Sequence, residues 1–223
     1  LTADGIWQKL DEYFFFGFGS ANTLIGFKSH TATIPPLANP VYTSNGIQLG
    51  TGGDNHIDTD VRLAVSPNYG LNVAEAGVFV HTQPAWGSGN NDLFGTQTGS
   101  VDPRLRMRHR GDDTNDWAAS INGTATINTP ALTTDIAGQL WSIKATAAAA
   151  ELYKNGVVQS DAVGPQPTIP PTYAIWVGVC NDQDTELQPC RGGTFTSFYV
   201  GGAIDTAKFY NRLMTFHAAL GVT

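Results

Sequence analysis

Four arginines at alternate positions are the sharpest chemical feature of the chain. They occupy the segment 104–110, Arg-Leu-Arg-Met-Arg-His-Arg, and make up a third of the 12 cationic residues. Side chains alternate between the two faces of a strand, so the four would share one face. Guanidinium groups bind carboxylates and phosphates through paired hydrogen bonds. The spacing predicts a ligand-binding ladder for an anionic glycan or a surface phosphate, formed by Arg104, Arg106, Arg108 and Arg110.

The same segment has a simpler interpretation as a solvated strand face. The residues between the arginines would then point into a core: Leu105, Met107 and His109. Three acids that follow closely could neutralise the arginines: Asp112, Asp113 and Asp116. A neighbouring subunit could do the same. In either case the arginines would bind no ligand.

Two tryptophans lie in or beside loops rich in Gly, Asn and Asp, where an exposed ring could stack on the apolar face of a sugar. They are Trp86 and Trp117. The alternative is that each ring anchors its own turn and is partly buried. The remaining tryptophans, Trp7, Trp141 and Trp176, are predicted to belong to the core.

Acidic residues raise the question of a calcium site. One group comprises Asp54, Asp58 and Asp60, and the other is again Asp112, Asp113 and Asp116. Neither has the alternating acids, central glycine and closing glutamate of an EF-hand loop, so solvated turn acids are the preferred interpretation. The five histidines lack the spacing of a zinc site. No cofactor is therefore predicted, with calcium as the alternative.

Cys180 and Cys190 are the two cysteines of the chain. A disulfide between them would close a short polar loop and stabilise the fold by roughly 2–3 kcal/mol. The alternative is two reduced thiols, one of them inside the strand of Trp176. The spacing excludes a Cys-x-x-Cys redox motif.

Short strands must position these groups. Trp141, Ile143 and Ala145 alternate with polar residues, and Asn155-Gly156 supplies the two positive-φ residues of a type I′ hairpin turn. Further strands are expected at 13–18, 47–49, 57–63, 74–82, 93–96, 105–110, 117–121, 124–128, 172–179 and 194–200. Because the strand at 13–18 is aromatic on both faces, it is expected between the sheets or against the terminal helix.

A helix is expected near each end of the chain. The first covers 4–12, with Asp4 as its N-cap. The second covers 205–221, with Asp205 or Thr206 as its N-cap and Gly221 at its C-terminal end. An apolar stripe at helical spacing is predicted to pack on the sheets or on a neighbouring subunit; it consists of Phe209, Leu213, Phe216 and Leu220.

Composition favours one domain spanning 1–223. The chain has 41% hydrophobic residues but only 14% charged ones, below the roughly 25% of ordinary soluble domains, which favours an extracellular or virion protein. A net charge of −7 argues against nucleic-acid binding. No apolar stretch reaches the length of a membrane span. The first residue, Leu1, suggests a part of a longer chain.

Several short motifs follow one another in a characteristic order: residues 4–11, 46–50, 55–59, Leu-Tyr-Lys-Asn-Gly at 152–156, Ile-Trp-Val-Gly at 175–178 and Phe-Tyr-Asn-Arg-Leu at 209–213. This order resembles the concanavalin-A-like and laminin-G-like jelly-roll domains of bacteriophage tail and other virion structural proteins. The resemblance implies an all-β fold, a two-sheet antiparallel β-sandwich (jelly roll) with a short N-terminal helix and one C-terminal helix.

The function implied by the resemblance is that of a non-enzymatic virion structural protein in a tail, fibre or capsid appendage. Its partners would be other virion proteins, copies of itself in a homo-oligomer such as a trimer, and host surface glycans. The alternative is a secreted carbohydrate-binding or adhesion module of a bacterial protein. Nucleic acid and membrane are not expected partners.

A diverged glycosidase is the third interpretation. Glycosidases that resemble this fold carry Glu-x-Asp-x-x-Glu on one strand, a pattern that none of the four glutamates fits: Glu12, Glu75, Glu151 and Glu186. Trp86-Gly-Ser-Gly-Asn matches a serine-nucleophile motif only superficially. The sequence therefore predicts no enzyme.

Overall fold

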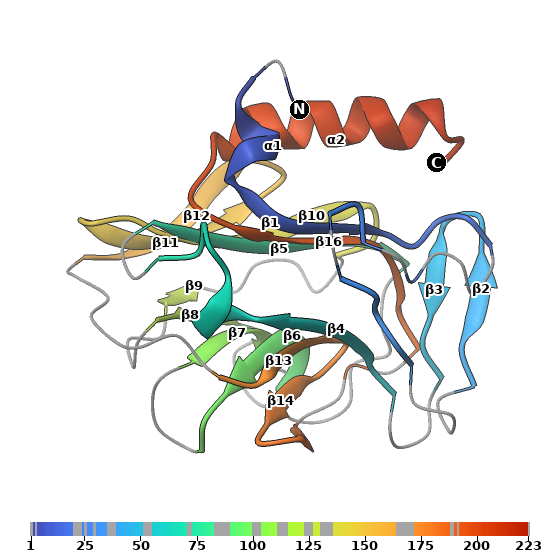
Figure 1. Ribbon diagram of the computed structural model, residues 1–223, viewed down its shortest axis with the longest axis horizontal. Helices are drawn as coiled ribbons and strands as arrows, with labels where there is room; N and C mark the ends of the chain where they lie inside the picture. Colours follow the sequence, from blue (N-terminus) through green and yellow to red (C-terminus); the bar gives the residue numbers. More distant parts are fainter. Residues whose placement is uncertain are drawn as a thin grey trace.

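Two β-sheets packed face to face make up most of the molecule in a computed structural model (Figure 1). The structure describes residues 2–222 apart from 3, 20–23, 25, 29, 35–38, 51–54, 71–72, 83–89, 100–103, 111–115, 123–126, 130–135, 164–171, 188–189 and 191. Neighbouring strands run antiparallel except β6 and β14, which are parallel. The predicted β-sandwich with one helix near each end of the chain is confirmed.

The first sheet has eight strands and lies next to the C-terminal helix (Figure 1). Its strands in spatial order are β12 (Val157–Val163), β11 (Ala149–Lys154), β10 (Gln139–Ala145), β5 (Ala74–Thr82), β16 (Thr194–Gly201), β3 (Gly46–Gln48) and β2 (Val41–Thr43). Strand β1 (Leu10–Phe15) also pairs with β16. Residues 74–82 form a strand with the predicted bounds.

The second sheet also has eight strands and carries the arginine segment. Its main path is β15 (Thr185–Leu187), β14 (Cys180–Asp182), β6 (Asn90–Gln97), β7 (Arg104–Arg110), β8 (Asp116–Ile121) and β9 (Ile127–Thr129). Strand β13 (Ala174–Val177) pairs with both β6 and β4 (Ile57–Arg62). A 3₁₀ turn, η2 (Leu63–Val65), follows β4 along the chain. Gly178, at φ +89°, follows β13, so the strand expected at 172–179 is shorter.

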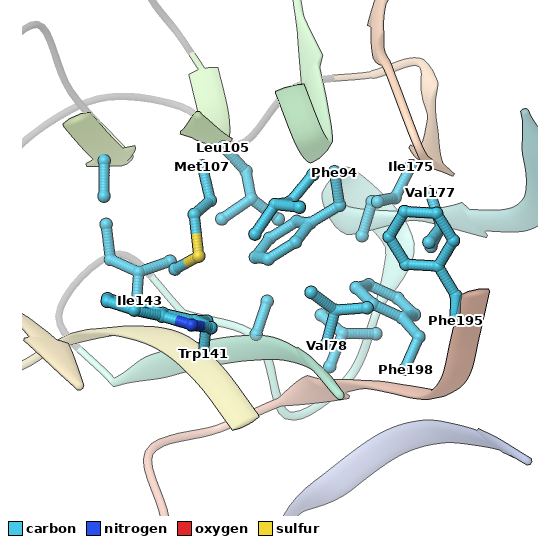
Figure 2. Close-up of a cluster of buried hydrophobic side chains, with 14 of the residues drawn as sticks. Val78, Phe94, Leu105, Met107, Trp141, Ile143, Ile175, Val177, Phe195 and Phe198 are labelled. Carbon is cyan, nitrogen blue, oxygen red and sulfur yellow. The ribbon is translucent and has the colours of Figure 1, made fainter. Parts of the chain in front are cut away.

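Apolar side chains from both sheets fill the space between them. Figure 2 shows Val78, Trp141, Ile143 and Phe198 of the first sheet facing Phe94, Leu105, Met107 and Ile175 of the second. All eight of these side chains are fully buried. Each such side chain stabilises the fold by about 1.5–3 kcal/mol relative to an exposed position, so this layer dominates the stability of the sandwich.

Residues 13–15 are aromatic on both faces of a strand, as predicted, although the strand β1 covers Leu10–Phe15 and not 13–18. Phe14 belongs to the core between the sheets, whereas Tyr13 and Phe15 belong to a second cluster beneath the terminal helix. The helix α2 (Thr206–Ala219) covers this outer face of the first sheet (Figure 1). The central strands of the first sheet, such as β16, are therefore buried on both sides.

Helix α2 begins and ends close to the predicted positions. The Asp205 carboxylate accepts a hydrogen bond from the Lys208 backbone N–H at 3.0 Å, and Gly221 has a φ of +74°. Phe209 and Leu213 are buried, but Leu220 is 41% exposed. His217 takes the expected place of Leu220 in the apolar stripe, because it packs against Phe15 and Phe79.

The N-terminal helix is shorter than predicted, because α1 covers only Ile6–Lys9. Gly5 precedes it, and Asp4 makes no cap; its carboxylate instead contacts Arg212 at 2.9 Å and Lys208 at 3.2 Å on α2. The next residues belong to β1. There the buried carboxylate of Glu12 accepts hydrogen bonds from three backbone N–H groups, those of Tyr13, Lys28 and His30.

A buried glutamate fixes the start of α2 on the first sheet. The Glu75 carboxylate accepts hydrogen bonds from the Tyr199 hydroxyl at 2.7 Å, and from the Ile204 N–H and the Thr206 hydroxyl at 3.2 Å each. Burial raises the pKa of Glu75 to about 7, although these donors partly oppose the rise. Helix α2 is therefore tied to β5 and β16 by an acid that is partly protonated at neutral pH.

The turn between β11 and β12 yields a prediction with an internal control. Asn155 and Gly156 have φ of 52° and 79°, which confirms the expected positive-φ pair. A Cβ at Gly156 would lie 2.8 Å from the Ala207 Cα, whereas one at Gly138, also at positive φ (69°), would meet nothing within 4 Å. We expect Gly138→Ala to cost about 1 kcal/mol of strain and Gly156→Ala clearly more in denaturant unfolding. Equal losses would contradict the contact with α2.

Glu75 predicts how stability depends on pH. Its pKa in the folded state lies above the ordinary value of 4.5, so protons bind the folded state more tightly and stability falls as pH rises from 4.5 to about 7. Burial lowers the pKa of His217 to about 4, which has the opposite effect. We therefore expect the unfolding free energy of the wild type minus that of Glu75→Gln to fall by about 3 kcal/mol across this range. A difference that stays constant with pH would contradict the assignment.

Candidate functional site

The arginine strand has the predicted alternation. Leu105, Met107 and His109 of β7 are buried on the inner side of the second sheet, where Figure 2 shows Leu105 and Met107 among the core side chains. The arginines consequently face away from the core. The side chain of Arg110 lies outside the described residues.

One arginine of the four is not available to a ligand as a free cation. Arg106 is only 7% exposed, and the Asp92 carboxylate beside it on β6 is fully buried. Arg106 Nε and Nη2 each donate to one Asp92 oxygen at 2.7 Å. Burial raises the pKa of Asp92 to about 6, and the Arg106 charge limits this rise, so the carboxylate is ionised at neutral pH.

This ion pair corrects the interpretation of the arginines as a uniform ladder. The four arginines do not form a uniformly exposed row, because Arg106 is buried. Arg106 pairs with Asp92, fourteen residues earlier in the chain. Asp112 and Asp113 lie outside the described residues, as does the side chain of Asp116. Sequence reasoning missed Asp92, although its position in a predicted neighbouring strand was the available signal.

A hydrogen-bond chain extends from the ion pair across three strands. Gln97 of β6 accepts from Arg106 Nη1 at 3.5 Å, and its own amide donates to Asp182 of β14 at 3.1 Å. Asp182 also accepts from the Gly99 N–H at 2.9 Å. The polar side chains of β6, β7 and β14 are therefore held in fixed orientations on the outer face of the sheet.

A shallow hollow opens over the arginine strand. It is a narrow surface depression with no enclosed room even for a water molecule, and it is lined by Arg104, Arg106, Arg108, Ala118 and Ser120. Arg104 and Arg108 are partly buried and lie about 13 Å apart along the strand. We call this hollow, with its two flanking arginines, the arginine face. The arginine face thus presents the guanidinium N–H donors of Arg104 and Arg108 next to Ala118 and Ser120.

The two loop tryptophans do not join the arginine face. Trp117 is fully buried, and its ring stacks on Trp141 with the centroids 4.2 Å apart. It lies on β8 next to His109 of β7, so alternation turns it into the core, and the expectation of an exposed sugar platform was wrong. Trp86 lies outside the described residues. Trp141 and Trp176 are buried, as predicted, whereas Trp7 is only partly buried.

Among the described residues, no group of three His, Cys, Asp or Glu side chains could hold a metal ion. Asp54 is not described. Asp58 accepts a hydrogen bond from the Asp60 N–H at 2.9 Å, which is a local turn interaction. The calcium candidates among Asp112, Asp113 and Asp116 stay a prediction.

Both cysteines are buried as free thiols. Burial raises the pKa of Cys180 and of Cys190 well above the ordinary value, so neither is a reactive thiolate at neutral pH. Of the two alternatives left open by the sequence, the structure contains the reduced pair. Cys180 Sγ would lie 3.1 Å from a Cβ built on Gly95, which explains a glycine in the middle of β6.

One further group on the second sheet was not predicted. The His56 ring stacks on Trp176 with centroids 3.8 Å apart, and its Nδ1 lies 2.7 Å from a Glu186 carboxylate oxygen. Trp176 is paired with Gly95 of β6. The group extends the polar and aromatic surface of this sheet from β6 toward β4 and β15.

No protein-family model and no curated protein sequence matches the chain. No helix among the described residues is long and apolar enough to cross a membrane. Evidence from known proteins therefore comes from solved structures alone.

The structure is similar to parts of several solved proteins at low sequence identity. Trypanosoma rangeli sialidase matches with a TM-score of 0.64 and 14% identity, over 91% of this chain and 32% of the sialidase. The binding domain of botulinum neurotoxin serotype G matches with a TM-score of 0.60 and 12% identity, over 92% and 51% of the two chains. The chain thus spans about a third of the sialidase.

A smaller protein matches over most of its own length. The CBM40 of the Ruminococcus gnavus IT-sialidase, also solved with bound α2,3-sialyllactose, has a TM-score of 0.50 and 14% identity, over 69% of this chain and 91% of the module. At such identities these likenesses establish the β-sandwich fold alone. None of the structures named here is a virion protein.

The buried ion pair generates a stability prediction. Asp92→Asn keeps the shape of the side chain but leaves the Arg106 guanidinium buried without a counter-charge, so we expect a loss of about 3–5 kcal/mol in denaturant unfolding. The double variant Asp92→Asn/Arg106→Gln removes both charges and should be more stable than the single variant. If the two variants unfold at the same denaturant concentration, the pair is not electrostatically coupled.

Proposed function

We propose that the chain is a non-catalytic carbohydrate-binding domain that binds anionic glycans on the arginine face. The observation that carries the proposal is that Arg104 and Arg108 line one shallow surface depression together with the small residues Ala118 and Ser120. Their strand is held by the Asp92–Arg106 pair. A sugar acid would present its carboxylate to guanidinium donors that are already oriented.

The similar structures support this choice of ligand. A module of the same fold from R. gnavus has been solved with sialyllactose, and the T. rangeli sialidase with sialic acid. Sialic acid carries a carboxylate, which fits a site built from arginines. The support is by analogy of fold, so the proposal itself rests on the residues of the arginine face.

The same face does not favour hydrolysis. Most glycosidases use two carboxyl groups that flank the scissile bond, although sialidases use a tyrosine as the nucleophile. Asp92 is fully buried and bound to both sides of the Arg106 fork, so it has no access to a substrate. Asp182 is engaged by Gln97 and the Gly99 N–H. We therefore propose binding without catalysis.

A virion location and a secreted location are compatible with the same binding face. The virion interpretation, with its oligomer and virion partners, rests on the order of the sequence motifs. The carbohydrate-binding interpretation also has the support of the solved structures. We therefore propose the secreted carbohydrate-binding module as the main interpretation, and host glycan contact by a virion protein as a use to which the same face is suited.

The test compares α2,3-sialyllactose with uncharged lactose by calorimetric titration. We expect the wild type to bind sialyllactose, with an affinity that falls as salt is added. Arg104→Ala/Arg108→Ala should bind it at least tenfold more weakly while keeping the wild-type circular dichroism spectrum. Arg62→Ala, which removes an exposed cation on β4, should bind as the wild type does.

Two outcomes would contradict the proposal. One is a double variant that binds sialyllactose as tightly as the wild type. The other is a wild type that binds lactose and sialyllactose equally, because the arginines would then contribute nothing to recognition.

A further inference from the structure

A groove lined by aromatic rings lies on the opposite side of the sandwich from the arginine face. It has a volume of about 380 Å³ and is lined chiefly by Trp7, Tyr13, Phe27, Arg212, Leu213 and Phe216. These residues come from α1, β1, the segment after β1, and α2. Figure 1 shows α1 and α2 on the outer side of the first sheet, to which β1 belongs. We call it the aromatic groove.

Three rings of the groove contact one another and leave an apolar surface open to solvent. The ring centroids of Tyr13 and Phe27 are 5.5 Å apart, and Phe216 lies 6.3 Å from Tyr13 and 6.4 Å from Phe27. Tyr13 is buried at the base, whereas Phe27 is 46% exposed. The packing of the protein does not require Phe27 to be exposed beside a cavity, so its position indicates a binding surface.

One cationic side chain, Arg212, lies in the lining of the groove. Arg212 and its neighbour Lys208 share a single acid, Asp4, which lies 2.9 Å from Arg212 and 3.2 Å from Lys208. These three groups together carry one net positive charge at this end. This excess stands against a net charge of −7 for the whole chain. Lys28, whose Nζ lies 5.3 Å from the centre of the Trp7 ring, lines a neighbouring hollow together with Asp11.

Lys28 does not add to this excess, because its charge interacts with the Asp11 carboxylate. The Glu12 side chain is fully buried, and its carboxylate accepts the N–H groups of Tyr13, Lys28 and His30. Its charge is thus directed at the backbone and away from the groove.

We propose that the aromatic groove binds a small amphipathic anion, an unbranched hydrocarbon chain that ends in one carboxylate. The apolar chain would lie against Phe27, Phe216 and Leu213, and the carboxylate would meet Arg212. A free sugar fits poorly, because sugars need several hydrogen-bond partners and the groove offers mainly rings. The site is separate from the arginine face and takes a different class of ligand.

The test titrates the intact chain with decanoate, far below its micellar concentration, and with uncharged decanol. We expect one decanoate per chain, with a dissociation constant on the order of 100 µM for a ligand of this size. Phe27→Ser should weaken both ligands about tenfold. Arg212→Gln should weaken decanoate about tenfold and leave decanol unchanged. Val157→Ser, which removes an exposed apolar side chain on β12, should change neither affinity.

Several outcomes would overturn the proposal. Absence of decanoate binding at millimolar concentration is the simplest. Equal effects of Arg212→Gln on decanoate and decanol would remove the role of charge. Binding to phosphatidylserine vesicles without binding to monomeric decanoate would identify a membrane surface. A dimer in light scattering that Phe27→Ser dissociates would identify a second copy as the occupant. A failure of glycan binding would affect none of these results.

Discussion

The rest of the structure depends on the burial of the central strands of the first sheet on both faces. One face forms the core with the second sheet, and the other is covered by α1 and α2 through a separate apolar cluster. All eight residues of β16 are consequently buried. The central part of the first sheet therefore offers no open face to a ligand, whereas the outer side of the second sheet carries the arginines of β7. The proposed glycan site lies on the second sheet because α1 and α2 cover the central part of the outer face of the first sheet.

Buried carboxylates keep this arrangement in register. Glu75 holds the start of α2, Glu12 holds the segment after β1, and Asp92 holds the middle of β7. Removing the hydrogen-bond partners of any one of these acids would destabilise the fold by several kcal/mol, because a buried carboxyl group without partners is poorly solvated. Shifted pairings that separate these acids from their donors are therefore disfavoured. The same three acids place the walls of both candidate sites.

Local patterns in the sequence predicted the elements well. Alternation gave the bounds of β5 and the two faces of β7, and the Asn155-Gly156 pair gave the turn after β11. These features depend on neighbouring residues alone. The helix α2 was likewise recognisable from its cap and its apolar stripe, except at Leu220, which lies at the C-cap where the helix ends.

The errors arose where residues far apart in the sequence meet. Asp92 reaches Arg106 only through the pairing of β6 with β7, which a bulge between Asp92 and Phe94 shifts by one residue. A one-residue shift changes which side chains share a face, so the counter-ion could not be read from spacing. Trp117 was misplaced because proximity to a loop does not decide which face of β8 it occupies. The aromatic groove was missed for the same reason, since its lining comes from both ends of the chain.

The two proposed sites lie on opposite outer faces of the sandwich, and a close-packed core separates them. Coupling between distant sites requires an element with two stable arrangements that both ligands bias. The layer between the sites is built from fully buried side chains such as Phe94, Trp141 and Phe198, and close-packed interiors do not deform continuously. A ligand in the aromatic groove would act on α2 and β1, whereas one on the arginine face would act on β7. The architecture therefore favours two independent binding events, in which the chain would bind a polar glycan on one side and an amphipathic anion on the other.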